Sequence, residues 1–129
     1  MSVKKIVVVG GGPAGMMASI RAGALKQDVT LVEKNTELGK KLLLSGKGRC
    51  NITNAGDLES FLKRFSTNGD FLRDAFKKFF NRELINFFES RGLKLKIERQ
   101  QRVFPVTDRS SSIKEILQEE LKKNKVRVK

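Results

Sequence analysis

The stretch VVVGGGPAGMMA, residues 7–18, decides the fold class of this chain of 129 residues. It contains the end of an apolar run at Val3–Val9, whose β-branched composition is typical of a buried parallel strand. Pro13 stands where the first turn of a helix would begin, because a residue there needs no N–H group, and we expect this helix to end near Leu25. The segment Val29–Glu33 predicts a second short strand. Together these segments predict an α/β fold that begins with a βαβ unit.

The glycines of this stretch have the spacing of a dinucleotide-binding turn. Gly10 permits the tight turn after the strand, Gly12 lets the backbone approach a pyrophosphate, and Gly15 lets the helix pack closely on the strand. The N–H groups at the start of the helix would hold the diphosphate. Glu33 lies eighteen residues beyond Gly15, at the end of the second strand, where a carboxylate accepts hydrogen bonds from a ribose. The pattern predicts a Rossmann-like dinucleotide site.

The motif alone fits both FAD and NAD, because both cofactors contain an ADP half. The next informative stretch is GKKLLLSGKGRCNITN, residues 39–54, which is not a P-loop because Lys47 is not followed by Ser or Thr. A glycine-rich loop after the ribose-binding strand can follow the rest of a long cofactor, with N–H groups that donate to phosphate and flavin oxygens. This favours FAD. An NAD-binding dehydrogenase domain is the alternative, and it leaves this loop unexplained.

The chain has one cysteine, Cys50, and no histidine. This composition excludes a disulfide within the chain, a Cys/His zinc site and a His-based catalytic triad. A lone thiol is more often a packing residue than a nucleophile, and the missing C-x-x-C excludes a dithiol relay. The sequence therefore assigns no catalytic residue and no metal ligand.

The net charge is +13 and the sequence pI is about 10.2, and residues 61–129 hold eighteen Lys and Arg against nine Asp and Glu, a net charge of +9. Such a chain attracts phosphates of any kind, so a basic, non-enzymatic nucleic-acid-binding module is a further alternative. The Phe residues fall at core spacing, and there is no Tyr or Trp to stack on bases, which argues against it. No apolar stretch has the length of a membrane helix, and the N-terminal apolar run leads into glycines rather than a cleavage site, so we expect a cytoplasmic protein.

The middle of the chain predicts two helices with a Phe-rich apolar face, in residues 69–93. Asn81 is predicted to cap the second helix and Gly92 to end it. The residues before this pair, from Lys34 to Ser60, lack periodicity and predict a loop.

The last third of the chain predicts a strand pair, a helix and another strand. Alternating apolar and Lys residues indicate a strand at Leu93–Ile97, with which Arg102–Val106 would pair. Ser112, followed by Glu115, forms a capping-box pattern for a helix. Val126–Lys129 predicts the start of a strand, and since the chain stops inside this element, we expect the N-terminal piece of a longer protein.

The whole pattern resembles the BaiN-like bacterial flavoproteins, often labelled NAD(P)/FAD-dependent oxidoreductases, which include aminoacetone oxidases. The segments that carry the resemblance are residues 7–18, LVEKN at 31–35, residues 39–54 and RVFPVTDRSSSI at 102–113. The resemblance implies an FAD-dependent oxidoreductase acting on a small molecule, with NAD(P)H as a candidate electron donor. It does not specify the substrate or the oligomeric state. By this resemblance, the stretch at residues 39–54 would form a wall of the flavin site.

The residues that we expect to bind the cofactor, from the motif and from the resemblance together, are Gly10, Gly12, Pro13, Ala14, Gly15, Glu33, Lys34, Gly39, Lys40, Lys41, Ser45, Gly46, Gly48, Arg49, Cys50 and Asn51. The chain departs from the family pattern at two positions, Lys47 and Gln101, where the family tends to have glycine. Lys47 would either place a cation near the flavin or point to solvent.

The implied fold is a Rossmann-like FAD-binding βαβ unit with a helical insertion and an incomplete doubly wound sheet. We expect four segments: the βαβ dinucleotide unit at 1–34, the cofactor-wall loop at 35–60, a helical and hairpin insertion at 61–110, and a helix and strand that return to the sheet at 111–129. Family members are about three times as long, so the FAD site in this chain alone would be incomplete and the chain by itself inactive.

Overall fold

The computed structural model describes residues 2–129, which pack as two compact units. Unit 1 consists of the residues up to Cys50 together with Arg109–Lys129, and unit 2 of Asn51–Asp108. The four segments expected from the sequence were defined by their places along a cofactor, and they stay a prediction.

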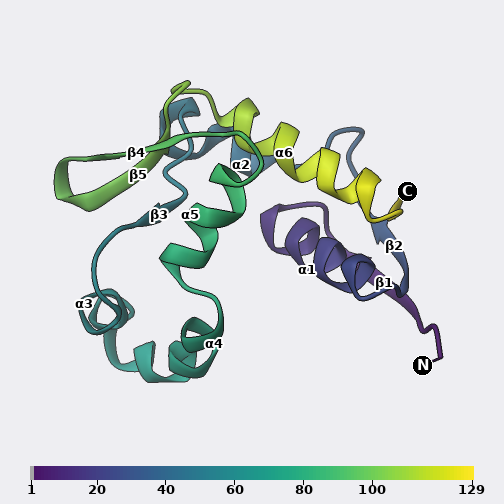
Figure 1. Ribbon diagram of the computed structural model, residues 1–129, viewed down its shortest axis with the longest axis horizontal. Coiled ribbons are helices and arrows are strands. Elements are labelled where there is room, and N and C mark those ends of the chain that lie inside the picture. Colours follow the sequence, from purple (N-terminus) through teal and green to yellow (C-terminus); the bar gives the residue numbers. More distant parts are fainter. Residues whose placement is uncertain (1) are drawn as a thin grey trace. The chain divides into compact units, whose positions relative to one another are not determined.

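Unit 1 is built on a parallel sheet of three strands. Its order is β1 (Lys5–Val9), β2 (Asp28–Val32) and β6 (Arg127–Val128), with helix α1 (Pro13–Ala24) connecting β1 to β2. Helix α6 (Ser110–Lys123) leads into β6, so the end of the chain returns to the sheet that its start forms (Figure 1). The predicted βαβ unit, the returning strand and the α/β class are confirmed.

Helix α1 packs on strands β1 and β2 and against helix α6. Val29 and Leu31 of β2 are fully buried there, together with Met16 of α1 and Ile113 and Leu117 of α6. Burying a side chain of this size stabilises a fold by about 1.5–3 kcal/mol, so these contacts hold the two ends of the chain together.

The opposite face of β1 is open, and this corrects one expectation. We expected Val3–Val9 to be buried throughout, but Val7 is 65% exposed and Val9 is 84% exposed. Successive side chains of a strand point to opposite faces, and the residues described here cover only one of the two.

Unit 2 combines short helices with an antiparallel sheet of order β3 (Thr53–Asn54), β5 (Arg102–Pro105) and β4 (Leu95–Glu98). The predicted pairing of the two later segments is confirmed, with Ile97 opposite Val103. The helices are α3 (Leu58–Lys63), α4 (Arg73–Lys78) and α5 (Asn81–Glu89), and a 3₁₀ segment (Ser66–Leu72) precedes α4. The predicted helical pair is therefore confirmed.

A cluster of four Phe side chains packs between these helices. The ring of Phe61 meets Phe76 at 5.3 Å and Phe80 at 5.1 Å between centroids, at interplanar angles of 76° and 80°. Phe65 completes the cluster at 5.8 Å from Phe61. Such edge-to-face contacts stabilise by about 0.5–1.5 kcal/mol each beyond the buried area. None of the four rings is fully buried, and Phe79 of the predicted apolar face is 43% exposed, so only part of that face packs in this cluster.

Two predicted caps are wrong by one to three residues, whereas the predicted stop at Gly92 is confirmed. Residue Phe80 takes the N-cap position of α5, where its N–H donates to the Glu83 carboxylate at 2.9 Å, so Asn81 is the first helical residue. Helix α6 already starts at Ser110, so Ser112 lies within its first turn rather than at its cap. Gly92, three residues beyond the end of α5, has a φ of +88°, as a helix stop of this kind requires.

The segment predicted as a loop from Lys34 to Ser60 contains regular structure. It includes helix α2 (Lys40–Leu44), a 3₁₀ turn (Ser45–Gly48), strand β3 and the start of α3. Helix α2 is too short for a periodic pattern to show, and it is anchored by burial of Leu42.

Candidate dinucleotide site

The glycine turn between β1 and α1 has the geometry that its spacing predicts. Gly10 has a φ of +106°, which favours glycine, and its N–H donates to the Val32 carbonyl at 2.8 Å. Pro13 occupies the first turn of α1, and Gly12 is the N-cap without any side-chain cap hydrogen bond. The first N–H groups of a helix have no partner inside the helix, so those of α1 are available to an anion.

Gly12 and Gly15 lack side chains for different reasons. A Cβ added to Gly15 would lie 1.8 Å from the Gly10 carbonyl oxygen, so this glycine permits the helix to approach the turn. A Cβ added to Gly12 would meet nothing within 4 Å. No neighbouring residue that the structure describes explains the missing side chain of Gly12, and the space above it suits the approach of a phosphate.

Glu33 is tied to the same turn by a residue that the sequence analysis missed. The Gly11 N–H donates to Glu33 Oε2 at 2.8 Å. A Cβ on Gly11 would lie 2.4 Å from Leu38 Cδ2 and 3.0 Å from Glu33 Oε2, so the middle glycine of the three is also required. The run of three glycines is the only sequence signal for it, because the x position of the motif specifies no residue.

The Glu33 carboxylate is held ionised by backbone donors. Its pKa is lowered, first by the Asn35 N–H, which donates to Oε1 at 3.0 Å, and next by the Gly11 N–H. The Asn35 side-chain amide also donates to Oε1, at 3.1 Å. The Lys34 backbone lowers the pKa further, so backbone groups of Asn35, Gly11 and Lys34 together hold this carboxylate in its charged form.

The start of the stretch at residues 39–54 is anchored on this turn as well. The Gly39 N–H donates to the Gly11 carbonyl at 2.8 Å, and Gly39 has a φ of +68°. Gly11 therefore uses its N–H for Glu33 and its carbonyl for the start of α2. The structure brings together the glycine turn, Glu33 and Gly39, and Lys34, Lys40 and Lys41 are exposed beside them in the chain.

The turn after α2 has an unusual backbone. Gly46, Lys47 and Gly48 have φ values of +57°, +57° and +85°. Lys47 thus has a conformation that favours glycine, the residue that the resemblance leads us to expect at this position. The turn is closed by its own hydrogen bonds, from Arg49 N–H to the Gly46 carbonyl at 3.2 Å and from Cys50 N–H to the Ser45 carbonyl at 3.0 Å.

Cys50 and Asn51 have structural contacts of their own. Cys50 is 2% exposed, and burial raises the pKa of its thiol, although a hydrogen bond with Ser45 acts in the opposite direction. A buried, protonated thiol is a poor nucleophile. The Asn51 amide donates to the carbonyls of Thr53 and Val103 within unit 2, at 2.8 and 3.0 Å. Binding of a cofactor by these two residues stays a prediction.

The part of the chain that the structure describes holds no group of three or more His, Cys, Asp or Glu side chains placed to bind a metal ion. Among its helices, none combines the length and the apolar character needed to cross a membrane.

Comparison with known proteins assigns the chain to a family. Residues 4–129 match the family model described as the HI0933-like protein Rossmann domain. The chain belongs to the HI0933-like family. This HI0933-like chain is 35% identical, over 98% of its length, to the 3-dehydro-bile acid delta(4,6)-reductase of Clostridium scindens, which confirms the resemblance to BaiN-like proteins. It is 33% identical, over 67% of its length, to the ribosomal RNA dihydrouridine synthase of Escherichia coli.

The HI0933-like chain spans 31% of the length of the first relative and 21% of the second. Among solved structures, it is similar to THI4 of Thermovibrio ammonificans, with a TM-score of 0.61 over 99% of this chain and 38% of that one. At 13% identity, this similarity supports the Rossmann fold alone.

Proposed function

We propose that the chain is the part of an FAD-dependent oxidoreductase that binds the ADP half of the cofactor. One observation carries the proposal: the open space at Gly12, the uncapped start of α1 and the ionised Glu33 all belong to one hydrogen-bonded turn. The diphosphate would lie against the N–H groups of Gly12, Ala14 and Gly15. Glu33 would hold the adenosine ribose and repel a 2′-phosphate.

The residues from Gly39 to Asn51 would follow the cofactor beyond the ribose. Gly46–Gly48 form an exposed left-handed turn, and its backbone N–H groups would donate to anionic oxygens of the cofactor. Lys40, Lys41 and Lys47 are exposed and would neutralise charge. FAD bound there would supply the electron chemistry, while this chain binds and orients it.

A reconstitution experiment tests the cofactor. The complete protein is incubated with FAD, passed through a desalting column and examined for flavin absorbance, and its affinities for FAD and NADH are compared. Glu33→Gln should weaken FAD binding by about tenfold, since a hydrogen bond to a charged group contributes about 1.5–3 kcal/mol. The exposed Glu119→Gln is the matched control. A wild-type protein without flavin absorbance, or one that binds NADH more tightly than FAD, would contradict the proposal.

The substrate is proposed to be a small molecule, with NAD(P)H as the electron donor. The support is the 35% identity to a protein named as a bile acid reductase. Anaerobic addition of NADH or NADPH to the FAD-loaded complete protein should bleach the flavin absorbance, and a flavin that neither reduces would contradict this choice of donor.

A second candidate substrate is a base in RNA, favoured by the 33% identity to a protein named as an rRNA dihydrouridine synthase and by the net charge of +13. The complete protein should then bind single-stranded RNA with an affinity that falls steeply as salt is added. Absence of binding at low salt would remove this candidate.

A further inference from the structure

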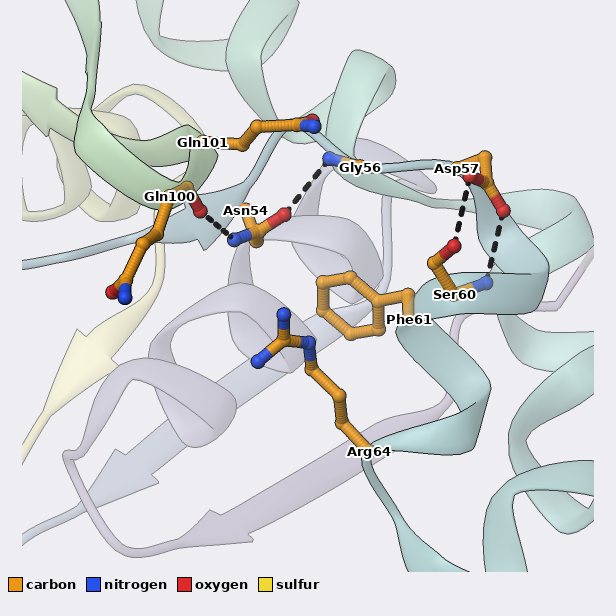
Figure 2. Close-up of a pocket in the computed structure, with 8 residues that line it drawn as sticks. All are labelled: Asn54, Gly56, Asp57, Ser60, Phe61, Arg64, Gln100 and Gln101. Carbon is orange, nitrogen blue, oxygen red and sulfur yellow. Dashed lines mark hydrogen bonds between the residues drawn. The ribbon is translucent and has the colours of Figure 1, made fainter.

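Unit 2 contains a pocket that the cofactor proposal does not use. Its volume is about 300 Å³, and all of its lining residues belong to unit 2 (Figure 2). The pocket has three walls: residues 54–57 at the end of β3 and after it, residues 60–64 of helix α3 and its C-cap, and Gln100 and Gln101 at the tip of the β4–β5 hairpin. A pocket of this size is at the small end of ligand sites and suits a molecule with a single ring.

Two polar side chains of the pocket, Asn54 and Asp57, already form hydrogen bonds within the protein. The Asn54 amide donates to the Gln100 carbonyl at 2.8 Å, and its Oδ1 accepts from the Gly56 N–H at 2.9 Å (Figure 2). The Asp57 carboxylate accepts from both the N–H and the hydroxyl of Ser60, each at 2.9 Å. These hydrogen bonds hold both side chains in place and so shape the pocket.

Other groups of the pocket are uncommitted. Arg64 lines the pocket, and its guanidinium has no hydrogen-bonding or ionic partner among residues 2–129. The Gln101 carboxamide likewise has none within the described chain, and its Oε1 lies near Gly56. The ring of Phe61 forms a wall whose orientation is fixed by the edge-to-face contacts with Phe76 and Phe80.

The hairpin tip holds its side chains in a conformation that favours glycine. Gln100 and Gln101 have φ values of +59° and +58°. Two hydrogen bonds hold the tip in place: the Asn54 side-chain amide donates to the Gln100 carbonyl, and the Ala55 N–H donates to the Gln101 carbonyl, both at 2.8 Å. Strain that the surrounding structure holds in place at a pocket is a reason to look for a ligand.

We propose that this pocket binds a small organic carboxylate with a flat ring. The pocket is lined by two charged side chains: Asp57 bonds to Ser60, whereas the Arg64 guanidinium has no partner in the described chain. A guanidinium matches a carboxylate with two parallel N–H groups. The Gln101 amide adds a neutral donor, and Phe61 offers its ring to the apolar body of the ligand. A phosphate has no apolar body to use this wall.

Equilibrium dialysis of labelled benzoate against the complete, FAD-loaded protein tests the proposal, with the flavin absorbance recorded in parallel to detect any benzoate at the flavin. We expect one saturable site that leaves the flavin spectrum unchanged. Arg64→Gln should weaken this site by about tenfold or more, since a charge-assisted hydrogen bond is lost. Gln101→Gly should weaken it by about threefold. Arg82→Gln, at an exposed Arg of α5 outside the pocket, is the matched control and should leave it intact.

Competition identifies the ligand class. Neutral benzamide should displace benzoate at least tenfold less well, and inorganic phosphate should not displace it. Absence of saturable binding, equal competition by phosphate or by uridine, or equal affinities of the Arg64→Gln and Arg82→Gln variants would each overturn the proposal. Loss of FAD binding in the Glu33→Gln variant would not affect this site, so the two proposals fail separately.

Discussion

Replacing Gly12 and Gly15 by alanine, one at a time, should separate folding from cofactor binding. The same methyl group is added at two positions of one turn, three residues apart. At Gly15 the new Cβ would lie 1.8 Å from the Gly10 carbonyl oxygen, and Cβ atoms in real proteins essentially never approach another heavy atom to under 3.0 Å. At Gly12 the Cβ would meet nothing within 4 Å, and the φ of −77° suits alanine.

The expected cost at Gly15 follows from this overlap. The obstacle is a backbone carbonyl, so α1 must shift from β1 by roughly 1 Å, and overpacking of this kind costs about 1–3 kcal/mol. Alanine recovers about 0.5–1 kcal/mol of backbone entropy within a helix. We therefore expect Gly15→Ala to lower the free energy of unfolding by about 1–2 kcal/mol. Gly12→Ala should change it by no more than about 0.5–1 kcal/mol, since alanine is a poor N-cap residue.

The affinity for FAD, in contrast, should be affected directly by Gly12→Ala. Gly12→Ala places a methyl group where the diphosphate would approach, and we expect at least about a tenfold weaker affinity for FAD in a protein that still folds. The measurements are urea unfolding of the apoprotein and titration of FAD by fluorescence, both on the complete protein. Unchanged FAD affinity of Gly12→Ala would refute the placement of the diphosphate, and unchanged stability of Gly15→Ala would refute the tight approach of the helix.

Three further predictions concern single side chains. Ser19 is fully buried and its hydroxyl has no partner among the described residues, so Ser19→Ala should raise the free energy of unfolding by about 1 kcal/mol, measured by urea unfolding. The pKa of Glu33 is lower in the folded protein than in the unfolded chain, so this carboxylate stabilises the fold at pH values above its unfolded pKa, and the contribution is lost as the pH falls through the folded pKa. The thermal midpoint of the wild type should therefore exceed that of Glu33→Gln by less in acid than at neutral pH. A difference that stays constant with pH would contradict this. Gln101→Gly removes about 1–2 kcal/mol of left-handed backbone strain from the folded protein, whereas the greater freedom of glycine in the unfolded chain costs about 0.5–1 kcal/mol. The thermal midpoint of this variant should therefore equal or exceed that of the wild type. A clear fall would show that the φ of +58° is not strained.

The glycine motif could be predicted from the sequence because each of its residues acts locally. The left-handed turn at Gly10, the proline at the start of α1 and the closely packed Gly15 depend on neighbours within a few positions. Spacing alone therefore specifies them. The strand after the helix follows from β-branched composition for the same reason, and β2 pairs with β1 as expected.

The errors arose where a distant residue decides a local feature. Ser112 shows a capping-box pattern, yet α6 starts two residues earlier, at Ser110, whose hydroxyl donates to the Leu43 carbonyl at 2.8 Å. Asparagine is a favourable N-cap residue, but the side-chain amide of Asn81 donates instead to the carbonyls of Asn54 and Gly56, both at 2.8 Å. In both cases the competing partner lies more than twenty residues away, and no local pattern records it.

Gly11 shows how a functional residue can stay hidden in a motif. Its N–H reaches Glu33, 22 residues on, and its carbonyl accepts from Gly39, both at 2.8 Å. The carboxylate that would hold the ribose and the loop that would follow the cofactor are thus positioned by the backbone of one residue. Every amino acid except proline has the same backbone N–H and C=O groups, so the sequence records only the steric condition, the absence of a Cβ. Gly11→Ala would push the new methyl group against Leu38 and Glu33 together, and it should therefore disturb the ribose position and the start of α2 at once.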